Sequence, residues 1–533
     1  MEVLQPTQLR RSAIASWVLV SIALPLWLQH ADGMSPQWLN HGGSITNDRH
    51  AVLEHKITQK TVSMLQKRWA FDAGFSVSAT PAIADGYVYC PSWNGNLFAV
   101  NATTGSLVWL KNLSTLTGIP LALSRSTPSI TRKLLLVGLR GPAMVIAVRR
   151  SDGKLMWKTL LDKHPEGIIT MSGTPHEGAF YVGTSSLEET SNPLQCCTFQ
   201  GSFHKLNVSN GRKMWRTVML PDNGGKKGGY SGAAIWGSSP AIDQLRKLVY
   251  IATGNNYQVP DYVTVCEEQQ RNRSKPNLPN PCANPKNHVE SILALDLASG
   301  RIMWSTALGG FDAWTYICAN NISAPNCPPI LGPDYDFGEA PMLLTVEEQS
   351  KYGGMRDILV AGQKSGVVWA VDRDTGAVLW ATPAGPGGYE GGATWGSATD
   401  GKKVFTNIAN NENRTFTLEP SKAKTTAGGW VALDARNGAI LWSAGNPDGK
   451  SPANGPVTIV NDVLLVGSND PLGFVYALNA HTGKVLWNAT TGSTVQGGFS
   501  VANGCAYIGT GYFYGIPGKL LYAFCLPSEL LCA

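Results

Sequence analysis

The chain has 533 residues, of which 15% are charged, well below the roughly 25% of ordinary globular proteins. The net charge is only +6 and Lys and Arg form no cluster along the chain, which argues against nucleic acid as a partner. Glycine (58 residues) and tryptophan (17 residues) are plentiful, as in proteins built from many short strands and tight turns.

The N-terminal residues resemble a targeting segment. Two arginines precede an apolar run over residues 13–28, and small residues follow as a candidate cleavage site. The run is shorter than the roughly 20 residues that a bilayer span needs. We therefore expect a cleaved signal peptide over residues 1–33, a mature domain over 34–533 and a secreted protein without stable membrane insertion, with an uncleaved anchor as the alternative. Seven glycosylation sequons fit this route: Asn101, Asn112, Asn207, Asn272, Asn321, Asn413 and Asn488.

Ten cysteines in an exported chain predict disulfides. Cys318 and Cys327 bracket a short loop rich in Pro and Asn, and Cys266 and Cys282 bracket a longer one. Two further cysteines are adjacent in the sequence. The chain has no Cys-x-x-Cys-His sequence, so it carries no attached c-type haem.

One sequence pattern recurs seven times. It begins with two apolar residues, which are usually followed by Asp or Asn, and it continues with any three residues, Gly, any three residues and Trp. It predicts a strand, a tight turn and a second strand, because the Asp or Asn side chain can hydrogen-bond the turn and Gly can take a positive φ. The tryptophan at a fixed offset can wedge between neighbouring sheets. The seven tryptophans are Trp109, Trp157, Trp215, Trp304, Trp380, Trp442 and Trp487.

Two more β-rich runs precede each phrase, as residues 78–83 and 87–92 do in the first repeat. Four strands make one propeller blade. An eighth repeat, 499–525, supplies three strands and lacks the final Gly-x3-Trp, whereas residues 66–72 form a spare strand with Trp69 in the expected place. We predict an all-β, eight-bladed β-propeller closed by one blade shared between the two chain ends, in preference to a pair of β-sandwich domains.

The repeat phrase resembles the tryptophan-docking motif of the quinoprotein, pyrroloquinoline quinone-dependent alcohol dehydrogenases. Within that family the chain is similar to the polyvinyl alcohol dehydrogenase-like branch, through residues 312–314, Cys318 and 332–338. The resemblance covers nearly all of the mature chain and implies a quinoprotein dehydrogenase-like propeller. The docking motif by itself indicates only the fold, because non-catalytic propellers carry it too.

The resemblance implies that pyrroloquinoline quinone lies near the axis on a tryptophan, under a disulfide between adjacent cysteines. Trp236, in Gly-Ala-Ala-Ile-Trp-Gly, matches the stacking tryptophan, and a planar cofactor needs such an aromatic floor. Cys196 and Cys197 match the disulfide. Trp395 lies in a similar Gly-Gly-Ala-Thr-Trp-Gly phrase, so a role in blade packing stays open for Trp236.

Other residues match further cofactor contacts of the family. Lys364 matches the cation beside the quinone carbonyls, where a fixed charge would polarise the carbonyl. Ser172 and Ser185 fall where cofactor hydroxyl contacts occur, and Arg125 is a candidate partner for a cofactor carboxylate. These last three are weaker matches.

The resemblance also implies a calcium ion held by Glu188, Asn255 and Asp336, the hard oxygen donors that calcium takes. Asp336 further matches the base that takes the proton of the alcohol. Glu189 is an alternative to Glu188, and Asp334 is an alternative to Asp336. Each of these acids could also be an ordinary solvated loop charge.

Together the matches predict a secreted quinoprotein-type alcohol dehydrogenase that transfers hydride from a small or polymeric alcohol to bound pyrroloquinoline quinone with Ca²⁺ assistance. Electrons would leave through a separate acceptor. Two departures weigh against catalysis: Ala234 stands where methanol-oxidising relatives carry a threonine, and the adjacent cysteines follow Glu188 instead of lying in an earlier blade. The alternatives are a non-catalytic propeller serving as a secreted binding or scaffold module, and a membrane-anchored ectodomain that binds glycans or peptides.

Overall fold

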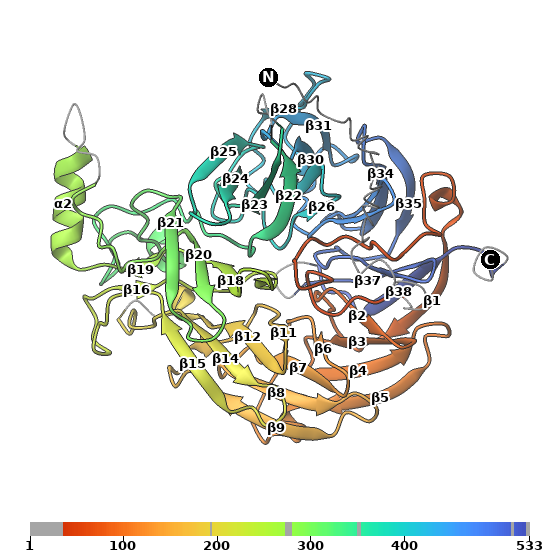
Figure 1. Cartoon of the computed structure of the whole chain (residues 1–533), viewed down its shortest axis with the longest axis horizontal. Coiled ribbons are helices and arrows are strands. Elements are labelled where there is room, and N and C mark those ends of the chain that lie inside the picture. The colour runs from red at the N-terminus through yellow and green to blue at the C-terminus, as the bar shows by residue number, and fades with distance from the viewer. Residues whose placement is uncertain (1–35, 192–193, 272–279, 349–352, 513–515, 529–533) are drawn as a thin grey trace, which may run out of the picture. The chain divides into compact units, whose positions relative to one another are not determined.

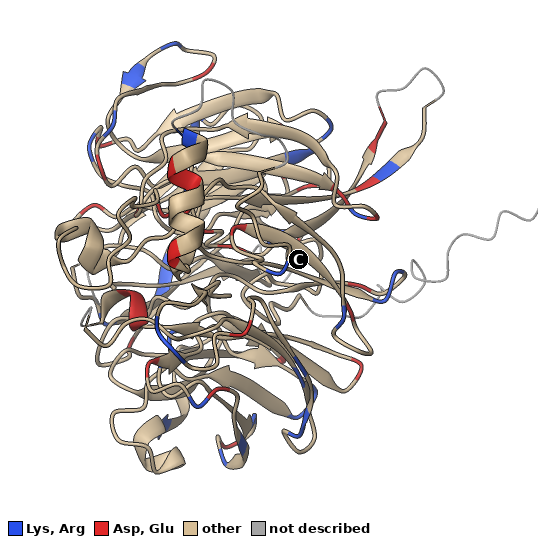
Figure 2. Ribbon diagram, turned by 90° about the vertical axis from the view of Figure 1, so that its left-hand side faces the viewer, with Lys and Arg blue, Asp and Glu red and all other residues tan. Residues whose placement is uncertain are grey.

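The computed structural model describes residues 36–191, 194–271, 280–348, 353–512 and 516–528. The expected signal segment 1–33, the sequon at Asn272 and Cys532 lie outside these residues. Within the described chain, no helix combines the length and apolar character needed to cross a membrane. Charged residues of both signs are scattered over the face shown in Figure 2.

Eight four-stranded antiparallel sheets surround one axis, which confirms the predicted eight-bladed propeller (Figure 1). We number the blades in chain order. Blade 1 contains β2 (Ala82–Ala84), β3 (Tyr87–Pro91), β4 (Asn96–Asn101) and β5 (Leu107–Asn112), and blade 2 contains β6 (Ser129–Ile130), β7 (Leu134–Gly138), β8 (Met144–Arg149) and β9 (Leu155–Leu160). Blade 3 contains β11 (Thr174–His176), β12 (Ala179–Gly183), β14 (Ser202–Asn207) and β15 (Lys213–Val218), and blade 4 contains β17 (Ala241–Asp243), β18 (Leu248–Ala252), β20 (Ser291–Asp296) and β21 (Ile302–Ala307).

The second half of the ring continues the pattern. Blade 5 contains β22 (Met342–Glu347), β23 (Met355–Gly362), β24 (Val367–Asp372) and β25 (Val378–Pro383), and blade 6 contains β26 (Ala398–Thr399), β27 (Lys403–Ile408), β30 (Gly429–Asp434) and β31 (Ile440–Gly445). Blade 7 contains β32 (Thr458–Val460), β33 (Val463–Gly467), β34 (Phe474–Asn479) and β35 (Val485–Thr490), and blade 8 contains β36 (Ser500–Ala502), β37 (Cys505–Gly509), β38 (Leu520–Cys525) and β1 (Gln66–Asp72).

Blade 8 is shared between the two ends of the chain, as predicted. Strand β1 pairs antiparallel with β38, and Trp69 lies opposite Ala523. A disulfide between Cys505 and Cys525 joins the two neighbouring strands of this blade. The first and last strands therefore lie side by side where the red and blue ends of the chain meet in Figure 1, and the ring has no open sheet edge there.

The repeat phrase explains how the blades stack. The repeat glycines, of which Gly211 is one, have φ near +70° and lie against the indole of the preceding blade. A Cβ added to Gly211 would lie 2.4 Å from the ring of Trp157, so only glycine permits both the turn and the contact. The Trp157 indole N–H also donates to the carbonyl of Val208 in the next blade (2.8 Å). The predicted wedging of tryptophan between sheets is thus confirmed.

The repeat gave no indication of a segment that touches every blade. Residues 38–54, here called the N-terminal strap, pass around the ring and hydrogen-bond to each blade in turn. The contacted residues are Ile83, Ile130, Thr174, Ile242, Leu343, Thr399, Ile459 and Gly504. Because the first seven lie on the first strands of blades 1–7, and Gly504 between the first two strands of blade 8, the strap ties all eight blades together at the axis.

The loops contain short helices, two-stranded sheets and disulfides. The helices are η2 (Val62–Met64), α1 (Leu113–Thr117), η3 (Glu188–Thr190), α2 (Asp261–Arg271) and α3 (Tyr316–Asn320), and the two-stranded sheets pair β10 (Gly167–Ile168) with β13 (Ser185–Ser186), β16 (Ser231–Gly232) with β19 (Asn256–Gln258), and β28 (Phe416–Thr417) with β29 (Lys424–Thr425). Cys266 bonds to Cys282 and Cys318 to Cys327, so both cysteine-bracketed loops are closed. Cys90 is a buried free thiol.

Candidate active site

Asp336 is the centre of a buried hydrogen-bonded group formed by loops of blades 4 and 5. Its side chain is 3% exposed. Oδ1 accepts the backbone N–H of Asn255 (2.5 Å), and Oδ2 accepts the indole N–H of Trp236 (2.9 Å) and the ammonium of Lys364 (3.3 Å). A Cβ on Gly254 would lie 2.4 Å from Oδ1, so glycine is required for this approach. Four of the residues singled out from the sequence are thus brought together in what we call the axial cluster.

Lys364 carries the positive charge of the axial cluster. Its Nζ lies 3.0 Å from Asp334 Oδ2 and 5.4 Å from the centre of the Trp236 ring. Burial lowers the pKa of Lys364, but the charges of Asp334 and Asp336 outweigh burial and raise the pKa above its usual value. Burial raises the pKa of Asp334 well above its usual value, and its Oδ1 is buried with no hydrogen-bond partner among the described residues. The cluster therefore combines one fixed cation with two neighbouring carboxyl groups.

Asn255 presents its amide oxygen in a fixed direction. Its Nδ2 donates to the carbonyls of Asn256 (2.8 Å) and Trp314 (3.0 Å), so the oxygen points to the opposite side of the amide plane. The main chain is held by the pairing of β16 with β19, where Gly232 lies opposite Asn256. Asn255 thus contacts Asp336 through its backbone N–H and carries an amide oxygen of the kind that can bind a metal.

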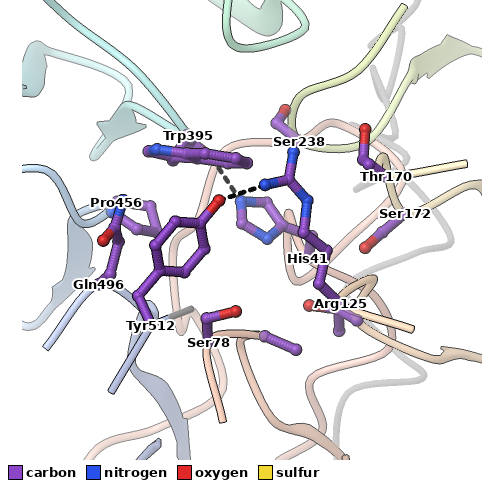
Figure 3. A pocket seen from close by; sticks show the side chains of 12 residues that line it. His41, Ser78, Arg125, Thr170, Ser172, Ser238, Trp395, Pro456, Gln496 and Tyr512 are labelled. Carbon is purple, nitrogen blue, oxygen red and sulfur yellow. Dashed lines mark hydrogen bonds between the residues drawn. The ribbon is translucent and has the colours of Figure 1, made fainter. Parts of the chain in front are cut away.

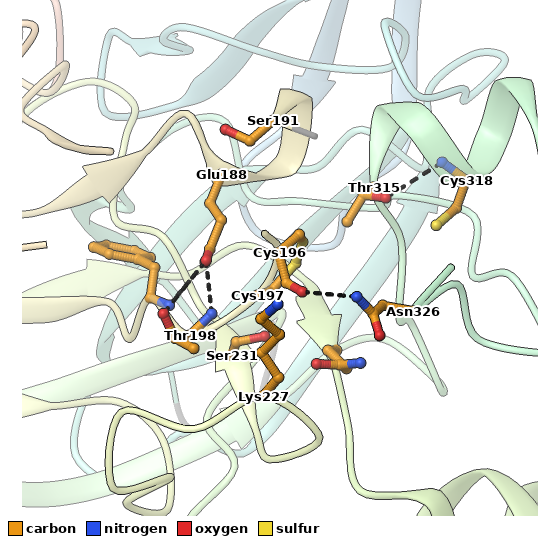
Figure 4. Close-up of a disulfide and its surroundings, with 12 residues drawn as sticks. Glu188, Ser191, Cys196, Cys197, Thr198, Lys227, Ser231, Thr315, Cys318 and Asn326 are labelled. Atoms are coloured by element: carbon orange, nitrogen blue, oxygen red, sulfur yellow. Dashed lines mark hydrogen bonds between the residues drawn. A yellow bond between two sulfur atoms is a disulfide. The ribbon is translucent and has the colours of Figure 1, made fainter. Parts of the chain in front are cut away.

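The two neighbouring glutamates of η3 face different surroundings. Glu188 Oε1 accepts the backbone N–H of Thr198 (2.7 Å) and Oε2 accepts that of Phe199 (2.8 Å) (Figure 4). Burial raises the pKa of Glu189 to about 7, while Lys364 opposes this rise and Asp336 adds to it. Glu188 therefore anchors the segment after the adjacent cysteines, and Glu189 is the glutamate within electrostatic reach of the axial cluster.

Cys196 and Cys197 form the predicted disulfide, across a cis peptide bond. The pair is buried and packs with Phe199 and Tyr257, and the Cys196 carbonyl accepts a hydrogen bond from Asn326 (3.3 Å; Figure 4). Burial raises the pKa of Tyr257, and the charges of Glu189 and Asp336 raise it further. Tyr257 therefore packs against the disulfide and lies within electrostatic reach of the carboxyl groups of the axial cluster.

A cavity on the axis adjoins the cluster (Figure 3). Arg125 lies in it with its guanidinium 4.7 Å from the Trp395 ring centre and donates to the hydroxyl of Tyr512. The rings of Trp395 and Trp236 meet edge to face, with centroids 5.1 Å apart, so the wall of this cavity packs directly against a member of the axial cluster. Ser172 also lines the cavity.

Ser185 lies apart from this cavity. It is buried on β13 opposite Ile168 and is not among the residues that line the cavity. The structure thus places Arg125 and Ser172 together on the axis, with Ser185 in a neighbouring two-stranded sheet.

The comparisons with known proteins agree on one group. A protein-family model described as outer membrane protein assembly factor BamB matches residues 58–221 and 427–514. The polyvinylalcohol dehydrogenase of Pseudomonas sp is 27% identical over 97% of this chain and 82% of its own length. A quinohemoprotein alcohol dehydrogenase of Comamonas testosteroni is 21% identical over 91% of this chain and 74% of its own length. The chain is thus similar in sequence to polyvinylalcohol and quinohemoprotein alcohol dehydrogenases.

Solved structures show the same fold. The quinohemoprotein alcohol dehydrogenase structure from Comamonas testosteroni superposes with a TM-score of 0.68 at 18% identity, covering 95% of this chain and 82% of that one. The enzyme ADHIIG from Pseudomonas putida HK5 gives a TM-score of 0.71 at 17% identity, covering 93% and 81%. The sequence similarities confirm the predicted resemblance to the quinoprotein alcohol dehydrogenases and to their polyvinyl alcohol dehydrogenase-like branch, and the solved structures confirm the propeller fold of that group.

Several residues of the candidate site could not be recognised from the repeat pattern of the sequence. His41 belongs to the N-terminal strap and donates from Nε2 to the Trp395 carbonyl (2.5 Å), and burial and the charge of Arg49 lower its pKa to about 3, so it is neutral. Tyr512 follows β37 and binds Arg125. Ala234, one of the two sequence departures, is buried and accepts the N–H of Gly254 through its carbonyl (2.9 Å), so it supports the connection between β18 and β19 that carries Asn255.

Proposed function

We propose that this protein is an exported quinone-dependent alcohol dehydrogenase that oxidises a small or polymeric alcohol at the axial cluster. The observation that carries the proposal is the buried carboxylate of Asp336, which receives the indole N–H of Trp236 and the ammonium of Lys364 beside the Asn255 amide. Buried carboxylates with a fixed cation beside them are typical of sites that move protons. The similarity to polyvinylalcohol dehydrogenases supports an alcohol as substrate.

The residues present fit pyrroloquinoline quinone, a planar molecule with carboxylate groups. Trp236 supplies an aromatic face and the Cys196–Cys197 disulfide lies near the same carboxyl groups through Tyr257. Arg125 Nε is buried with no hydrogen-bond partner among the described residues, and a guanidinium with a free donor suits a carboxylate. Ser172 would line the same pocket, and Ser185 would act from the neighbouring sheet. When bound, the quinone would supply a two-electron acceptor for the hydride.

Calcium fits the donor set of the same site. Asn255 offers an amide oxygen and Asp336 a carboxylate, both hard donors of the kind that calcium takes. Among the described residues, no group of three or more His, Cys, Asp or Glu side chains is arranged as a metal site, so an amide ligand is a necessary part of the set. We propose Asn255, Asp336 and one glutamate of η3 as ligands. The position of Glu189 in the field of Lys364 favours it, with Glu188 as the alternative.

The side chains divide the work of the proposed reaction. Asp336 takes the proton of the alcohol hydroxyl as general base. The Trp236 N–H and the Asn255 backbone N–H fix the direction of its two oxygens. Lys364 keeps its positive charge in the site and stabilises negative charge that develops beside it. Because the chain carries no attached haem, electrons would leave through a separate acceptor protein or molecule.

Reconstitution tests the proposal directly. Purified protein is mixed with pyrroloquinoline quinone and Ca²⁺, binding is followed by quenching of tryptophan fluorescence, and oxidation of an alcohol panel is followed with an artificial electron acceptor. We expect both binding and turnover, and turnover should disappear in Asp336→Asn but persist in Asp296→Asn, a matched change at a rim turn. Wild-type protein that neither binds the quinone nor oxidises any alcohol would overturn the proposal.

A scaffold function is the second candidate, because the assembly-factor family model matches only residues 58–221 and 427–514. These segments hold the regular blades and omit Trp236, Asn255, Asp336 and Lys364. A propeller maintained only for binding would not need a buried base and cation. Quinone binding without oxidation of any alcohol would favour the scaffold or a quinone sensor over the enzyme.

A further inference from the structure

A row of amide side chains crosses the loops of blades 6, 7 and 8. Asn411 Nδ2 donates to Asn454 Oδ1 (3.1 Å), and Asn454 Nδ2 donates back to Asn411 Oδ1 (3.3 Å). The backbone N–H of Asn454 donates to Asn469 Oδ1 (2.9 Å), and Asn469 Nδ2 lies 3.5 Å from Gln496 Oε1. The four side chains therefore form one continuous row over three blades, here called the amide row.

The amide row lies on the face of the ring that carries the axial cluster. Because the strands of a blade alternate in direction, the loop between its second and third strands and its connection to the next blade emerge on one face. Asn411 and Asn469 lie on loops of the first kind, and Asn454 and Gln496 lie on connections of the second kind. Asp336 lies on such a connection as well, between blades 4 and 5.

Both ends of the amide row reach the candidate active site. At one end, Gln496 lines the axial cavity (Figure 3). At the other end, Asn411 Nδ2 also donates to the carbonyl of Glu390. In the loop that carries Glu390, the N–H of Gly388 donates to the carbonyl of Lys364 (3.1 Å). The row therefore follows the axial opening from the cavity to the loop that packs on Lys364.

A pair of aromatic rings connects the same loop to the axial cluster. The rings of Tyr389 and Trp314 stack with centroids 6.0 Å apart and planes at 25°, and Tyr389 is 41% exposed. The carbonyl of Trp314 accepts the Nδ2 donor of Asn255 (3.0 Å). Tyr389 immediately precedes Glu390 in the sequence, so the pair lies between the axial cluster and the start of the amide row.

The amide row and the aromatic pair have the chemistry of a surface for neutral hydroxyl groups. The four amide side chains are half-buried, and an amide has two N–H donors and an oxygen with two lone pairs. Each amide can therefore bind a hydroxyl group at its open side. An exposed aromatic ring such as that of Tyr389 offers an apolar face for the C–H groups between hydroxyls. Burial and the charge of Glu390 raise the pKa of Tyr389, so this ring is neutral too.

We propose that the amide row and the Trp314–Tyr389 pair bind a polyhydroxylated chain, one hydroxyl of which lies at Asp336. Oxidation of the bound chain rests on the proposed function, whereas its binding does not. A synthetic polyol and a glycan present the same alternation of hydroxyl and C–H groups, so both are used as probes.

Affinity electrophoresis tests binding without any cofactor. The protein is run in native gels that contain poly(vinyl alcohol), dextran or no polymer. We expect at least one polymer to retard wild-type protein, and we expect Asn454→Leu and Tyr389→Ala to weaken this binding by about 10-fold, because they remove hydrogen bonds and a ring contact. Retardation by poly(vinyl alcohol) alone would identify a synthetic polyol as the ligand, and retardation by dextran alone would identify a glycan.

Matched controls come from exposed residues outside the row. Asn437 is exposed in a turn between the third and fourth strands of blade 6, where its Oδ1 accepts the N–H of Ala439 (3.0 Å). Tyr262 is 65% exposed on α2. Asn437→Leu and Tyr262→Ala should be retarded like wild-type protein. No retardation of wild-type protein by either polymer, or equal retardation of all variants, would overturn the inference.

Substrate selectivity provides the second readout, in protein reconstituted with quinone and Ca²⁺. We expect Asn454→Leu and Tyr389→Ala to lower the ratio of kcat/KM for the retarding polymer to kcat/KM for 2-butanol by about 10-fold, mainly through a higher KM for the polymer, because binding remote from the reacting hydroxyl is lost. Asn437→Leu should keep this ratio within about 2-fold. Polymer binding without any oxidation would refute the proposed function alone, whereas an unchanged ratio in both row variants of an active enzyme would overturn this inference alone.

Discussion

At the rim of the ring, Trp442 lies against Gly483 of the next blade and donates its indole N–H to the Ala480 carbonyl there (3.0 Å). At the axis, Trp236 donates its indole N–H to the carboxylate of Asp336 and has Lys364 over its ring. Apart from Trp304, whose indole nitrogen has no hydrogen-bond partner among the described residues, the rim tryptophans bond to the backbone of the neighbouring blade, a partner that a repeating fold supplies. The axial tryptophan bonds to a titratable side chain, which only one loop supplies.

Acidic residues differ between the two regions in the same way. At the rim, hydrogen bonds from Ser299 lower the pKa of Asp296, and the hydrogen bond from Arg436 lowers that of Asp434. At the axis, burial raises the pKa values of Asp334 and Glu189. Rim carboxylates therefore stabilise the folded state at neutral pH, whereas axial ones reduce its stability. Buried acids that reduce stability are common at functional sites, which supports the role proposed for the axis.

Replacing a rim tryptophan should have the largest effect on stability. Trp442→Ala removes a buried ring and its hydrogen bond, and we expect it to lower the free energy of unfolding by about 3–5 kcal/mol, measured by denaturant titration. Quinone affinity of the folded fraction should be unchanged. Loss of quinone binding at normal stability would contradict the division between rim and axis, and Trp442→Phe provides the milder control.

A buried axial acid should make stability depend on pH. Burial raises the pKa of Glu339 to about 7, although the Gly362 N–H and Ser397 oppose it. Because the folded state then binds more protons than the unfolded state between pH 4.5 and about 7, stability should fall as pH rises through this window, by on the order of 3 kcal/mol. Glu339→Gln should abolish this fall.

Asp434 at the rim provides a control, because its effect on the pH dependence of stability has the opposite sign. The pKa of Asp434 is lowered, so its contribution to stability is present above its unfolded pKa and should be lost as pH falls through the folded value. Asp434→Asn should flatten the acid side of the curve of unfolding free energy against pH and leave the neutral side unchanged. Identical pH curves for wild-type protein and Glu339→Gln would contradict the assignment for Glu339.

Removing the proposed base should separate turnover from binding. We expect Asp336→Asn to cut turnover on the order of 10²-fold or more, because an amide cannot take the hydroxyl proton. Quinone binding should stay measurable, since Trp236 and Lys364 remain. Turnover within a few-fold of wild-type protein would show that another group acts as base, with Asp334 the first to test.

The two axial tryptophans should differ in their effect on the cofactor. Trp236→Ala should weaken quinone binding by about 1–3 kcal/mol, as loss of a stacking ring does. Trp395→Ala should have a smaller effect, because Trp395 contacts the axial cluster only through the edge of Trp236 and otherwise packs on Arg125. Fluorescence titration of both variants measures this, and a larger loss in Trp395→Ala would make Trp395 the stacking ring.

The rim could be predicted from the sequence because its rules are local and repeated. Gly-x3-Trp specifies a turn and a docking ring by itself, and the missing eighth outer strand pointed to Trp69. The axis could be predicted only in part. Matching phrases identified Trp236, Asn255, Asp336 and Lys364, but their distances depend on loops from separate blades. The N-terminal strap has no repeat pattern, so its hydrogen bonds to the blades became visible only in the structure.

Glu188 and Glu189 test a distinction that the sequence left open, namely which of the two glutamates binds calcium. Both match the glutamate position, and only the turn of η3 sends their side chains in different directions. If Glu189 is the ligand, Glu189→Gln should weaken Ca²⁺ binding by about 10-fold, because the number of ligand charges sets calcium affinity, and should leave the thermal midpoint unchanged. Glu188→Gln should instead lower the thermal midpoint, since Thr198 and Phe199 N–H groups lose a carboxylate acceptor, and should leave Ca²⁺ affinity within about 2-fold. Calcium titration of the two variants with quinone present decides between them, and the reverse pattern would assign the metal to Glu188.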